Sequence, residues 1–442
     1  MIRKYLIFSY LSKSFFKIFK PINPIDFNGV QTFEHNYIKK ILYIFNEVHL
    51  FKILNIETFQ KFLIILKETF LTIYKIILYP ISYAISLTRF RFLHINSWQV
   101  GAYVQQLDTI IKANKLGKNY KLIFAYPKFL RTNDFFSEFY ENELISFDNF
   151  ILYLFFYPFI NTKICSINNW NYETINPKSS FNQIHKKFSQ KFKKNNLAEI
   201  NLDTKMIVKK FLINKNITLN KKMICLQSRD QNFYTGPRTR GTNLEIIEPI
   251  IDYLLMRDFV VVRFISKYST HIFGNKKKNY LEINIDNEIS KKIQFSFINE
   301  SFLVICYQGG IHSMNQIVKT PFLQINSIPI NINGLIKRTD KIITKKFFST
   351  VKKKYLSFEE IKKRNLHLYV DIRSTKKNKV VIVDNSLDEI IDSLNEIIDD
   401  KEYENSLFKK LIKKFDEDIS FYHSDAKIAE SFLRKNQYFL DK

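Results

Sequence analysis

The sequence is poor in glycine and cysteine. Of its 442 residues only nine are glycine and three are cysteine, namely Cys165, Cys225 and Cys306. An odd, widely spaced set of cysteines excludes a disulfide framework and a cysteine-based metal motif, and it is typical of a reducing compartment. We therefore expect a cytoplasmic protein. Because glycine is so scarce, an adjacent pair such as Gly309 and Gly310 is unlike an ordinary surface turn.

Long uninterrupted apolar runs are also missing. The longest apolar stretch, Phe70–Leu87, contains Lys75 and breaks at Pro80, whereas a spanning helix needs roughly 20 apolar residues. We predict a helix that lies on a membrane surface, with Lys75 reaching to the headgroups. A buried helical hairpin of a soluble domain is the near-even alternative, and a transmembrane span comes third. The basic first residues lack the apolar core and cleavage site of a secretory signal.

Acidic residues are outnumbered by basic ones. The chain has 68 Lys and Arg against 42 Asp and Glu, a net charge of +26. Such a balance points to nucleic acid or an anionic membrane, but no zinc-finger or ribonucleoprotein motif is present. We expect no nucleic-acid partner and interpret most lysines as ordinary surface residues. The membrane interpretation is kept for the N-terminal part.

One stretch in the second half has the pattern of a ligand-binding loop after a buried strand. The apolar run Met223–Leu226 stops abruptly at Gln227, and Arg229 and Asp230 follow after Ser228. In an open α/β sheet, ligands sit beyond the carboxyl ends of the strands, and a guanidinium fits phosphate or carboxylate. A bare Arg-Asp pair is more often a surface turn. Here a helical pattern at 244–256 and a β run at 259–265 complete a βαβ unit.

The same order of elements is predicted again downstream. A strand at 302–306 ends in Tyr307-Gln308-Gly309-Gly310, a helix opens at Ile311, and a strand at 321–325 leads to Asn326. Glycine lets backbone amides approach a ligand, and a helix N-terminus favours an anion. Together with Arg229, Arg240 and the strand residue Arg263, this turn predicts an anion pocket. Arg263 is alternatively a structural ion pair.

A second βαβ pattern occupies the first half. We predict a strand at 91–95, a loop with Asn96, Gln99 and Gly101, a helix at 103–115 and a strand at 120–126. The loop polar groups are candidates for contact with an acceptor. Residues 151–158 are either a strand or part of an acceptor wall, and helices are expected at 181–192 and 204–212. Near the C-terminus we predict a last strand at 380–383 and a helix capped by Asn385 or Ser386.

From about Met223 to Asn326 the chain resembles a bacterial family assigned as glycosyltransferases of surface-polysaccharide loci. The resemblance is carried by the Arg-Asp strand end and the turn and strand motifs after it, here Arg229-Asp230, Phe233-Tyr234, Arg240, Val261-Val262-Arg263, Gly309-Gly310 and Pro321…Asn326. Gln227 stands where the family often has His, and Gly241 where it commonly has Asn. The family is distantly similar to fucosyltransferases, in which a motif Arg grips the diphosphate of the donor.

The resemblance implies a GT-B-like α/β fold, two Rossmann-like domains facing a cleft, and transfer of a hexose or deoxyhexose from a nucleotide sugar to a glycan or lipid-linked acceptor. Arg229 would grip the diphosphate, with Asp230 as the base to test, and Arg240, Arg263, Gln308, Gly309, Gly310 and Asn326 on the donor side. We expect no cofactor and no metal, since no Asp-x-Asp pair stands where a GT-A fold requires one. Pyruvyl or other group transfer on the same fold, and a non-catalytic membrane-associated binding protein, are the alternatives.

The predicted organisation has four parts. Residues 1–89 form a helical, membrane-associating segment, and residues 90–205 form an acceptor domain with its linker. Residues 206–400 form the donor domain, and 401–442 a helical tail. The protein is thus expected to be peripheral at the inner face of the cytoplasmic membrane.

Overall fold

The structure is a computed structural model. It describes residues 73–442 except 75–76, 79, 82, 86, 94, 96–99, 128–134, 157–177, 195, 201, 218–219, 229–243, 266–271, 273–276, 285–287, 329, 331–334, 368–371, 401–405, 415–423 and 442. The chain divides into two compact units, Met1–Pro177 and Lys178–Lys442. The division lies before α6 (Lys178–Phe192) and α7 (Thr204–Asn214), so the segment that we assigned to a linker belongs to the second unit. Both helices were predicted.

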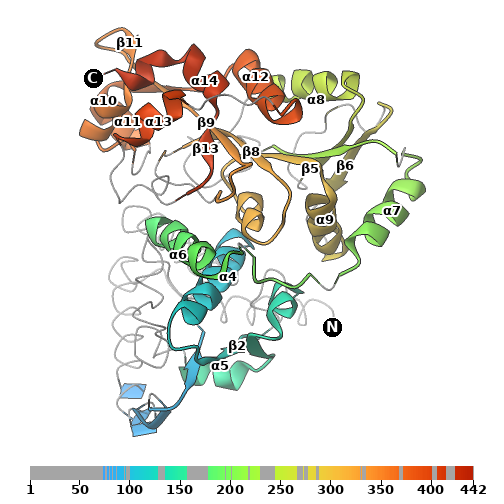
Figure 1. The fold of residues 1–442 in the computed structure, drawn as a ribbon, viewed down its shortest axis with the longest axis vertical. Coiled ribbons are helices and arrows are strands. Elements are labelled where there is room, and N and C mark those ends of the chain that lie inside the picture. Colours follow the sequence, from blue (N-terminus) through green and yellow to red (C-terminus); the bar gives the residue numbers. More distant parts are fainter. Residues whose placement is uncertain are drawn as a thin grey trace, which may run out of the picture. The chain divides into compact units, whose positions relative to one another are not determined.

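The first unit contains a small parallel sheet. Its strands are β1 (Phe90–Phe92), β2 (Lys121–Ala125) and β3 (Leu144–Phe147), in the order β1-β2-β3. Helix α4 (Val100–Leu116) connects the first two strands, as predicted. A 3-10 helix, η3 (Phe135–Tyr140), precedes β3 (Figure 1). The βαβ unit expected from the sequence is therefore present, and β3 extends it.

Helix α4 is buried along most of its length and carries charge into the interior. Lys112 and Asp108 form an ion pair at 2.8 Å, and both side chains have no exposed surface. Tyr140 of η3 donates a hydrogen bond to Asp108 at 2.7 Å. Burial raises the pKa of Asp108 and lowers that of Lys112, while their mutual attraction opposes both shifts. The pair, spaced i and i+4, thus satisfies charges that would otherwise be costly to bury.

One segment of the first unit differs from its prediction. Residues 151–158 were expected to be a strand or part of an acceptor wall, and the strand is wrong because α5 (Phe150–Phe156) is a helix. Asn149 caps it, because its side chain accepts a hydrogen bond from the Leu152 amide at 2.9 Å. Phe156 stacks on Phe92 of β1 and joins a hydrophobic cluster with Leu78 and Ile85.

The second unit is built on a seven-stranded parallel sheet. Its order is β13-β9-β8-β7-β4-β5-β6, and every neighbouring pair is parallel. The strands are β4 (Met223–Gln227), β5 (Val260–Ile265), β6 (Tyr280–Asn284), β7 (Leu303–Cys306), β8 (Phe322–Ser327), β9 (Lys341–Thr344) and β13 (Lys427–Ile428). Numbered along the chain, β4 to β9 run 3-2-1-4-5-6 across the sheet, which is the strand order of the Rossmann fold. The fold is therefore mixed α/β with parallel sheets.

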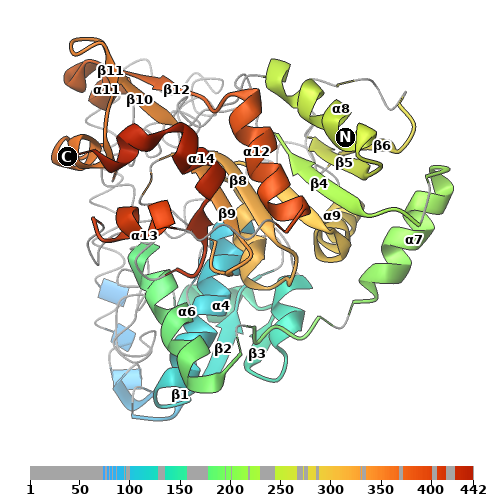
Figure 2. The same ribbon diagram turned by 45° about the horizontal axis from the view of Figure 1, so that its top comes forward.

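Helices cover both faces of this sheet. Helix α8 (Ile247–Met256) packs on β5, and α12 (Leu387–Ile398) packs on β8, β9 and α8. On the other face α9 (Glu288–Glu300) packs on β4, β6 and α7 (Figures 1 and 2). Because the central strands are buried on both faces, they consist of continuous apolar runs and were predictable from the sequence.

Helix boundaries follow local chemistry. Pro249 lies in the first turn of α8, where no intrahelical amide bond is lost. Thr242 and Asn243, which precede this helix in the sequence, lie outside the described residues. Helix α12 has Ser386 as its N-cap in a capping box with Glu389, and this decides between the two predicted caps.

The C-terminal part adds a small antiparallel sheet and closes one edge of the large one. Strands β10 (Lys346–Ser349), β11 (Lys354–Tyr355) and β12 (Val380–Val383) pair antiparallel in the order β11-β10-β12. The strand predicted at 380–383 thus exists but is not the last one, because β13 follows within the expected helical tail. The remaining helices are α10 (Phe358–Lys363), α11 (Ile372–Asn378), α13 (Ser406–Ile412), α14 (Glu430–Lys435) and η12 (Gln437–Leu440).

Among the described residues, no helix is long and apolar enough to cross a membrane.

Candidate active site at the β4–β7 edge

The sheet of the second unit has one point where the strand order reverses. Strands β4 and β7 are neighbours, and the chain leaves them toward opposite edges of the sheet. A crevice forms outside the carboxyl ends of two such strands, and ligands of open α/β folds bind there. Ser228 directly follows the carboxyl end of β4, and Tyr307 directly follows the carboxyl end of β7. The two segments singled out in the sequence therefore both begin at the reversal point.

Side-chain distances bring the two segments into contact. A Cβ atom built on Gly309 would lie 3.9 Å from Gln227 Nε2 and 4.0 Å from Gln227 Oε1. Gln227 is the last residue of β4 and stands two positions before Arg229 in the sequence. Its Oε1 atom is buried and has no hydrogen-bond partner within the described part of the chain. The end of β4 thus packs directly on the glycine turn after β7.

The glycine turn differs in two respects from its prediction. The helix expected from Ile311 is a six-residue 3-10 helix, η10 (Ile311–Gln316), so its dipole at Gly310 is small. Gly310 has φ −61° and ψ −37°, which any residue adopts, and Gly309 is likewise outside the left-handed region. Backbone conformation does not require glycine at these positions, and a Cβ atom on Gly309 would meet Gln227 and the Tyr307 carbonyl oxygen only at ordinary contact distance.

His312 occupies part of this turn and was not singled out in the sequence. The Gly309 amide donates a hydrogen bond to His312 Nδ1 at 3.1 Å, and the same nitrogen contacts the Gly309 carbonyl oxygen. The imidazole is nearly buried. The amide expected to face an anion is therefore held by an internal partner. The signal that could have found His312 is its place three residues after a glycine that follows a buried strand.

Arg263 lies in the interior of the sheet rather than in an open pocket. Its Nη1 donates to Glu282 Oε1 at 2.7 Å, and its Nε donates to Ser228 Oγ at 2.9 Å. The Arg263 side chain is 0% exposed and that of Glu282 is 1% exposed. Of the two interpretations given for Arg263, this geometry supports the structural ion pair rather than direct contact with a donor. Through Ser228, Arg263 holds the residue that directly precedes Arg229.

Glu282 is the centre of a satisfied buried network. Besides Arg263, its carboxylate accepts hydrogen bonds from the Tyr280 hydroxyl at 2.7 Å and the Ile272 amide at 3.0 Å. Burial raises the pKa of Tyr280, and the neighbouring Glu282 carboxylate raises it further. Arg263 and Glu282 are direct partners in the β5–β6 register. The network thus links β5 and β6 to each other and to Ser228, the residue that follows β4 beside the candidate site.

Two further donor-side candidates are also buried. Gln308 is 3% exposed and Asn326 is 2% exposed. Asn326 is the residue before the last in β8 and has φ 51°, a left-handed conformation that asparagine tolerates better than most residues. Its amide and side-chain oxygen exchange hydrogen bonds of 2.7 Å with Asn385, at the start of α12. In the described part of the chain its Nδ2 atom is buried and has no hydrogen-bond partner.

Most of the remaining candidates fall outside the described residues. These are Arg229, Asp230 and Arg240 on the donor side, and Asn96 and Gln99 on the acceptor side. Gly101 is described, and it lies in the first turn of α4 instead of the predicted loop, because the helix begins at Val100.

A partly buried lysine, Lys337, lies after β8 and supports the segment that follows the glycine turn. Lys337 Nζ donates to the carbonyl oxygens of Val318 at 3.2 Å and Thr320 at 2.5 Å, just after η10. Asp340 accepts from the Lys337 amide at 2.8 Å and from the Phe322 amide at 3.0 Å. Burial lowers the pKa of Lys337 to about 8, against the opposing pull of Asp340. Sequence reasoning missed this residue, which fixes the segment between the glycine turn and β8.

The cysteines and acids of this region do not suggest other chemistry. Burial raises the pKa of Cys225 to about 12 and that of Cys306 further, so neither is a reactive thiolate. Within the described residues, no group of three His, Cys, Asp or Glu side chains is placed to hold a metal ion.

Comparison with protein-family models and with curated proteins found no match. Among solved structures, that of a glycosyl transferase family 9 protein from Veillonella parvula DSM 2008 matches with a TM-score of 0.34 and 11% sequence identity. The match covers 69% of this chain and 80% of that one. A TM-score of this size does not establish a shared fold, so the candidate site depends on the geometry described above.

Proposed function

We propose that the protein is a GT-B-type glycosyltransferase that moves a hexose or deoxyhexose from a nucleotide sugar to a surface-polysaccharide or lipid-linked acceptor. The observation that carries the proposal is that Gln227, at the end of β4, lies beside the turn after β7 at the reversal point, 3.9 Å from where a Cβ atom on Gly309 would be. It supports a shared pocket for the segment that begins with Ser228-Arg229 and the turn at 307–310. The sequence resemblance assigns donor binding to the same two segments.

In the proposed mechanism, Arg229 neutralises the negative charge that develops on the leaving nucleoside diphosphate. Electrostatic stabilisation of this kind is usually the largest single contribution to transfer, and the planar guanidinium suits two phosphate oxygens at once. The buried Arg263–Glu282 pair positions Ser228, next to Arg229, so that less side-chain and loop freedom is lost when the donor binds.

The turn after β7 and the end of β8 supply the remaining donor contacts in this proposal. In this proposal the diphosphate lies against the turn at Gly309 and Gly310, and Asn326 contributes its side-chain amide to the donor. Arg240 adds a second positive charge. Asp230 is the proposed base for the acceptor hydroxyl, and Asn96, Gln99 and Gly101 belong to the acceptor side. We further propose that transfer needs no metal and takes place at the cytoplasmic face of the membrane.

A thermal-shift screen tests donor binding. Nucleoside diphosphates should raise the melting temperature of the parent protein, since a ligand at 100 times its Kd stabilises by about 2.7 kcal/mol. Arg229→Ala should abolish the shift. Arg257→Ala is the matched control, because Arg257 pairs with Asp399 on the surface and its loss removes the same charge away from the site. An unchanged nucleotide shift in Arg229→Ala would refute the assigned role.

The same screen separates the competing chemistry. Phosphoenolpyruvate in place of nucleotides tests pyruvyl transfer. A protein that is stabilised by phosphoenolpyruvate and by no nucleoside diphosphate is not a glycosyltransferase of this kind.

A further inference from the structure

The helical residues just before β1 are apolar on two sides. Between positions 73 and 85, Leu78 and Ile85 turn inward and pack on the cluster around Phe156. A second row, which we call the apolar stripe, consists of Ile73, Ile77 and Ile81 and is open to solvent, and Leu87 in the turn that follows is also exposed. A soluble helix normally has a polar outer face, and a helix that is apolar all round is normally covered. The stripe therefore needs an occupant.

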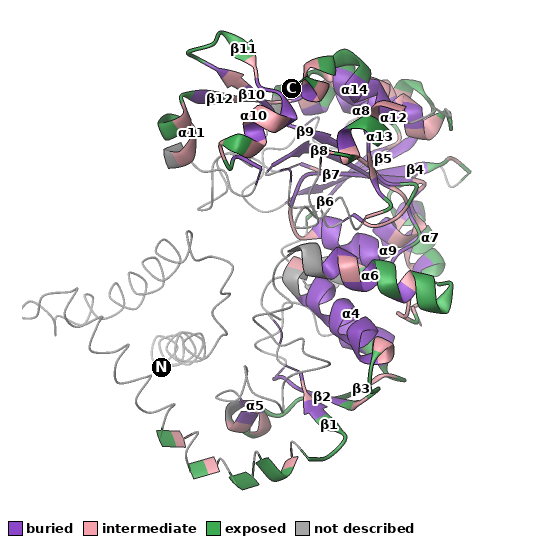
Figure 3. Ribbon diagram, turned by 60° about the vertical axis from the view of Figure 1, so that its left-hand side comes forward, coloured by how far each residue is buried: buried purple, intermediate pink, exposed green. Residues whose placement is uncertain are grey.

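The exposure of the stripe is large and regular. Ile77 is 66% exposed and Leu87 is 72% exposed, and Ile73 and Ile81 are about half exposed. The isoleucines are spaced by four residues, so they share one face of the helix. Tyr83 is exposed nearby and supplies an aromatic ring with a polar end, a group that favours the level of lipid headgroups. In Figure 3 the described residues of this segment are coloured mostly as exposed.

The helix is fixed to the first unit at its C-terminal end. The Thr88 hydroxyl donates to the Ile85 carbonyl oxygen at 2.7 Å, and Arg91 Nη1 donates to the Thr88 carbonyl oxygen at 2.9 Å. Phe92, the last residue of β1, stacks on Phe156. Leu78 and Ile85 thus pack on the first unit through the cluster around Phe156.

Charge identifies the kind of occupant. From position 69 to position 133 the sequence contains one acidic residue, Asp108, and that carboxylate is buried against Lys112. The basic residues of the same range include Arg89 and Lys121, both exposed. A stretch of chain with exposed isoleucines, exposed cations and no exposed carboxylate matches anionic lipid, which attracts cations near the headgroups and accepts apolar side chains below them. The exposed carboxylates among the described residues of the first unit, Glu138, Glu141 and Asp148, lie later in the chain.

We propose that the apolar stripe docks the first unit on an anionic membrane surface, with the isoleucines inserted below the headgroups and Arg89 among them. The inference shares a membrane location with the proposed glycosyltransferase function, but docking requires neither a donor nor sugar transfer. A surface of this kind holds an enzyme beside acceptors that are themselves anchored in lipid.

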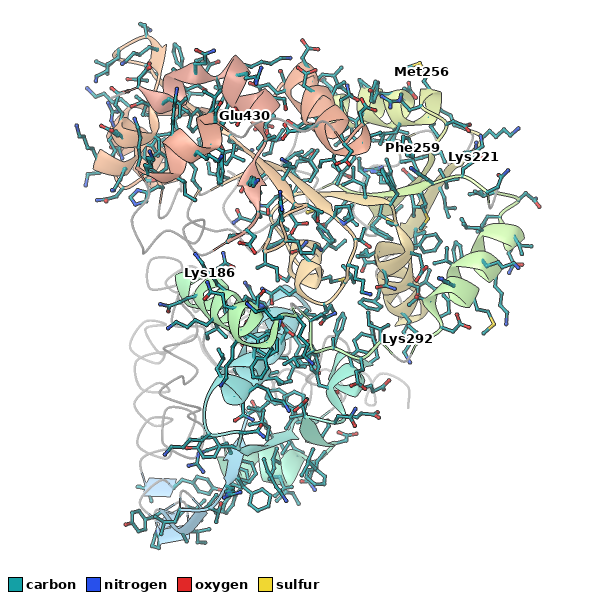
Figure 4. All side chains as sticks on the ribbon, viewed as in Figure 1. Lys186, Lys221, Met256, Phe259, Lys292 and Glu430 are labelled. Carbon is teal, nitrogen blue, oxygen red and sulfur yellow. The ribbon has the colours of Figure 1, made fainter. Side chains whose placement is uncertain are left out.

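Vesicle co-sedimentation with the full-length protein tests the proposal. The parent protein should bind vesicles of phosphatidylglycerol and phosphatidylcholine, and the bound fraction should fall as salt rises. Ile77→Ser combined with Ile81→Ser should weaken binding roughly tenfold to hundredfold, since each isoleucine contributes several buried methylene equivalents. The control removes two exposed apolar side chains from the second unit, Met256→Ser with Val351→Ser, and should bind as the parent does. Figure 4 labels Met256 on the outer side of α8.

A spectroscopic readout keeps the test independent of how well the serine variant folds. In Tyr83→Trp, the difference in emission from the parent protein should shift to shorter wavelength on addition of anionic vesicles, and brominated lipids should quench it. Unchanged binding of the serine variant, or equal binding to vesicles of phosphatidylcholine alone, would overturn the proposal. So would emission that is already blue-shifted without lipid, or a dimer in sedimentation velocity that the serine substitutions dissociate, because another protein surface would then cover the stripe. Nucleotide thermal shifts on the same variants report separately on the donor site.

Discussion

Breaking the buried pair of Arg263 and Glu282 should cost more stability than almost any surface change. Glu282→Gln keeps the shape and the acceptor oxygen for the Tyr280 hydroxyl and the Ile272 amide, but it leaves the Arg263 charge uncompensated in a fully buried position. Removing one partner of such a pair costs about 3–5 kcal/mol. Arg263→Met leaves the opposite charge buried and should cost a similar amount.

The double substitution decides whether the pair acts as a unit. Arg263→Met with Glu282→Gln removes both charges together, and the amide introduced at position 282 still accepts the two remaining hydrogen bonds. We expect the double variant to lose about 2 kcal/mol less than the sum of the single losses, which is the size of coupling found for contacting residues. The linear dependence of unfolding free energy on urea gives each value.

The probe has to follow the second unit. Both tryptophans, Trp98 and Trp170, precede residue 178, where that unit begins, so tryptophan fluorescence reports on the other one. Far-UV circular dichroism is the suitable signal, and the unfolding transition of the second unit has to be separated from that of the first in the urea titration. Additive losses, or a Glu282→Gln variant within about 1 kcal/mol of the parent, would refute the statement that these charges are buried against each other.

Two other predictions concern the turn and its support. Lys337→Met should destabilise the second unit by about 3 kcal/mol, because it orphans buried backbone carbonyl oxygens and the Asp340 carboxylate. Since the folded pKa of Lys337 is about 8 and the ordinary value is 10.5, the unfolded chain binds more protons between these values, and the contribution of Lys337 to stability should rise from pH 8 to pH 10.5. A parent-minus-variant difference that is flat in urea titrations over this range would contradict the burial of the amine. Gly309→Ala places a methyl group in ordinary contact with Gln227, so the free energy of unfolding should change by less than about 1 kcal/mol. Nucleotide affinity should nevertheless drop. Equal affinity would mean that the donor does not approach this turn.

The sequence was sufficient to predict the central strands and their order along the chain. Strands β4, β5, β7 and β8 are continuous apolar runs bounded by polar residues, and burial on both faces produces that pattern. Helix α12 was predicted for a similar reason, since its capping serine and its apolar spacing are local signals. Strands and helices that are specified by neighbouring residues in the sequence can thus be predicted without a structure.

Elements that depend on distant partners were missed. Strand β3 is four residues long, half exposed and flanked by acidic residues, so it lacks a buried strand pattern and forms because β2 offers a parallel edge. Helix α5 is so uniformly apolar that periodicity cannot separate a helix from a strand. In the candidate site, the turn at Gly309 and an ion pair of Arg263 were predicted, but the partner of Arg263 and the internal bonds of His312 were not, because those partners are fixed by the fold.

The strand at one edge of the large sheet comes from far along the chain. Among the described strands, β13 (Lys427–Ile428) is the only one that pairs with β9 on its outer side. Helix α14 follows β13, and its Glu430 accepts hydrogen bonds from backbone amides at the start of α13. Until residue 428 has been synthesised, β9 presents a row of unpaired amides and carbonyls that any other extended segment can join. Chains cut short before that point, by premature termination or proteolysis, should therefore self-associate even though every residue of the nucleotide-site candidates is still present.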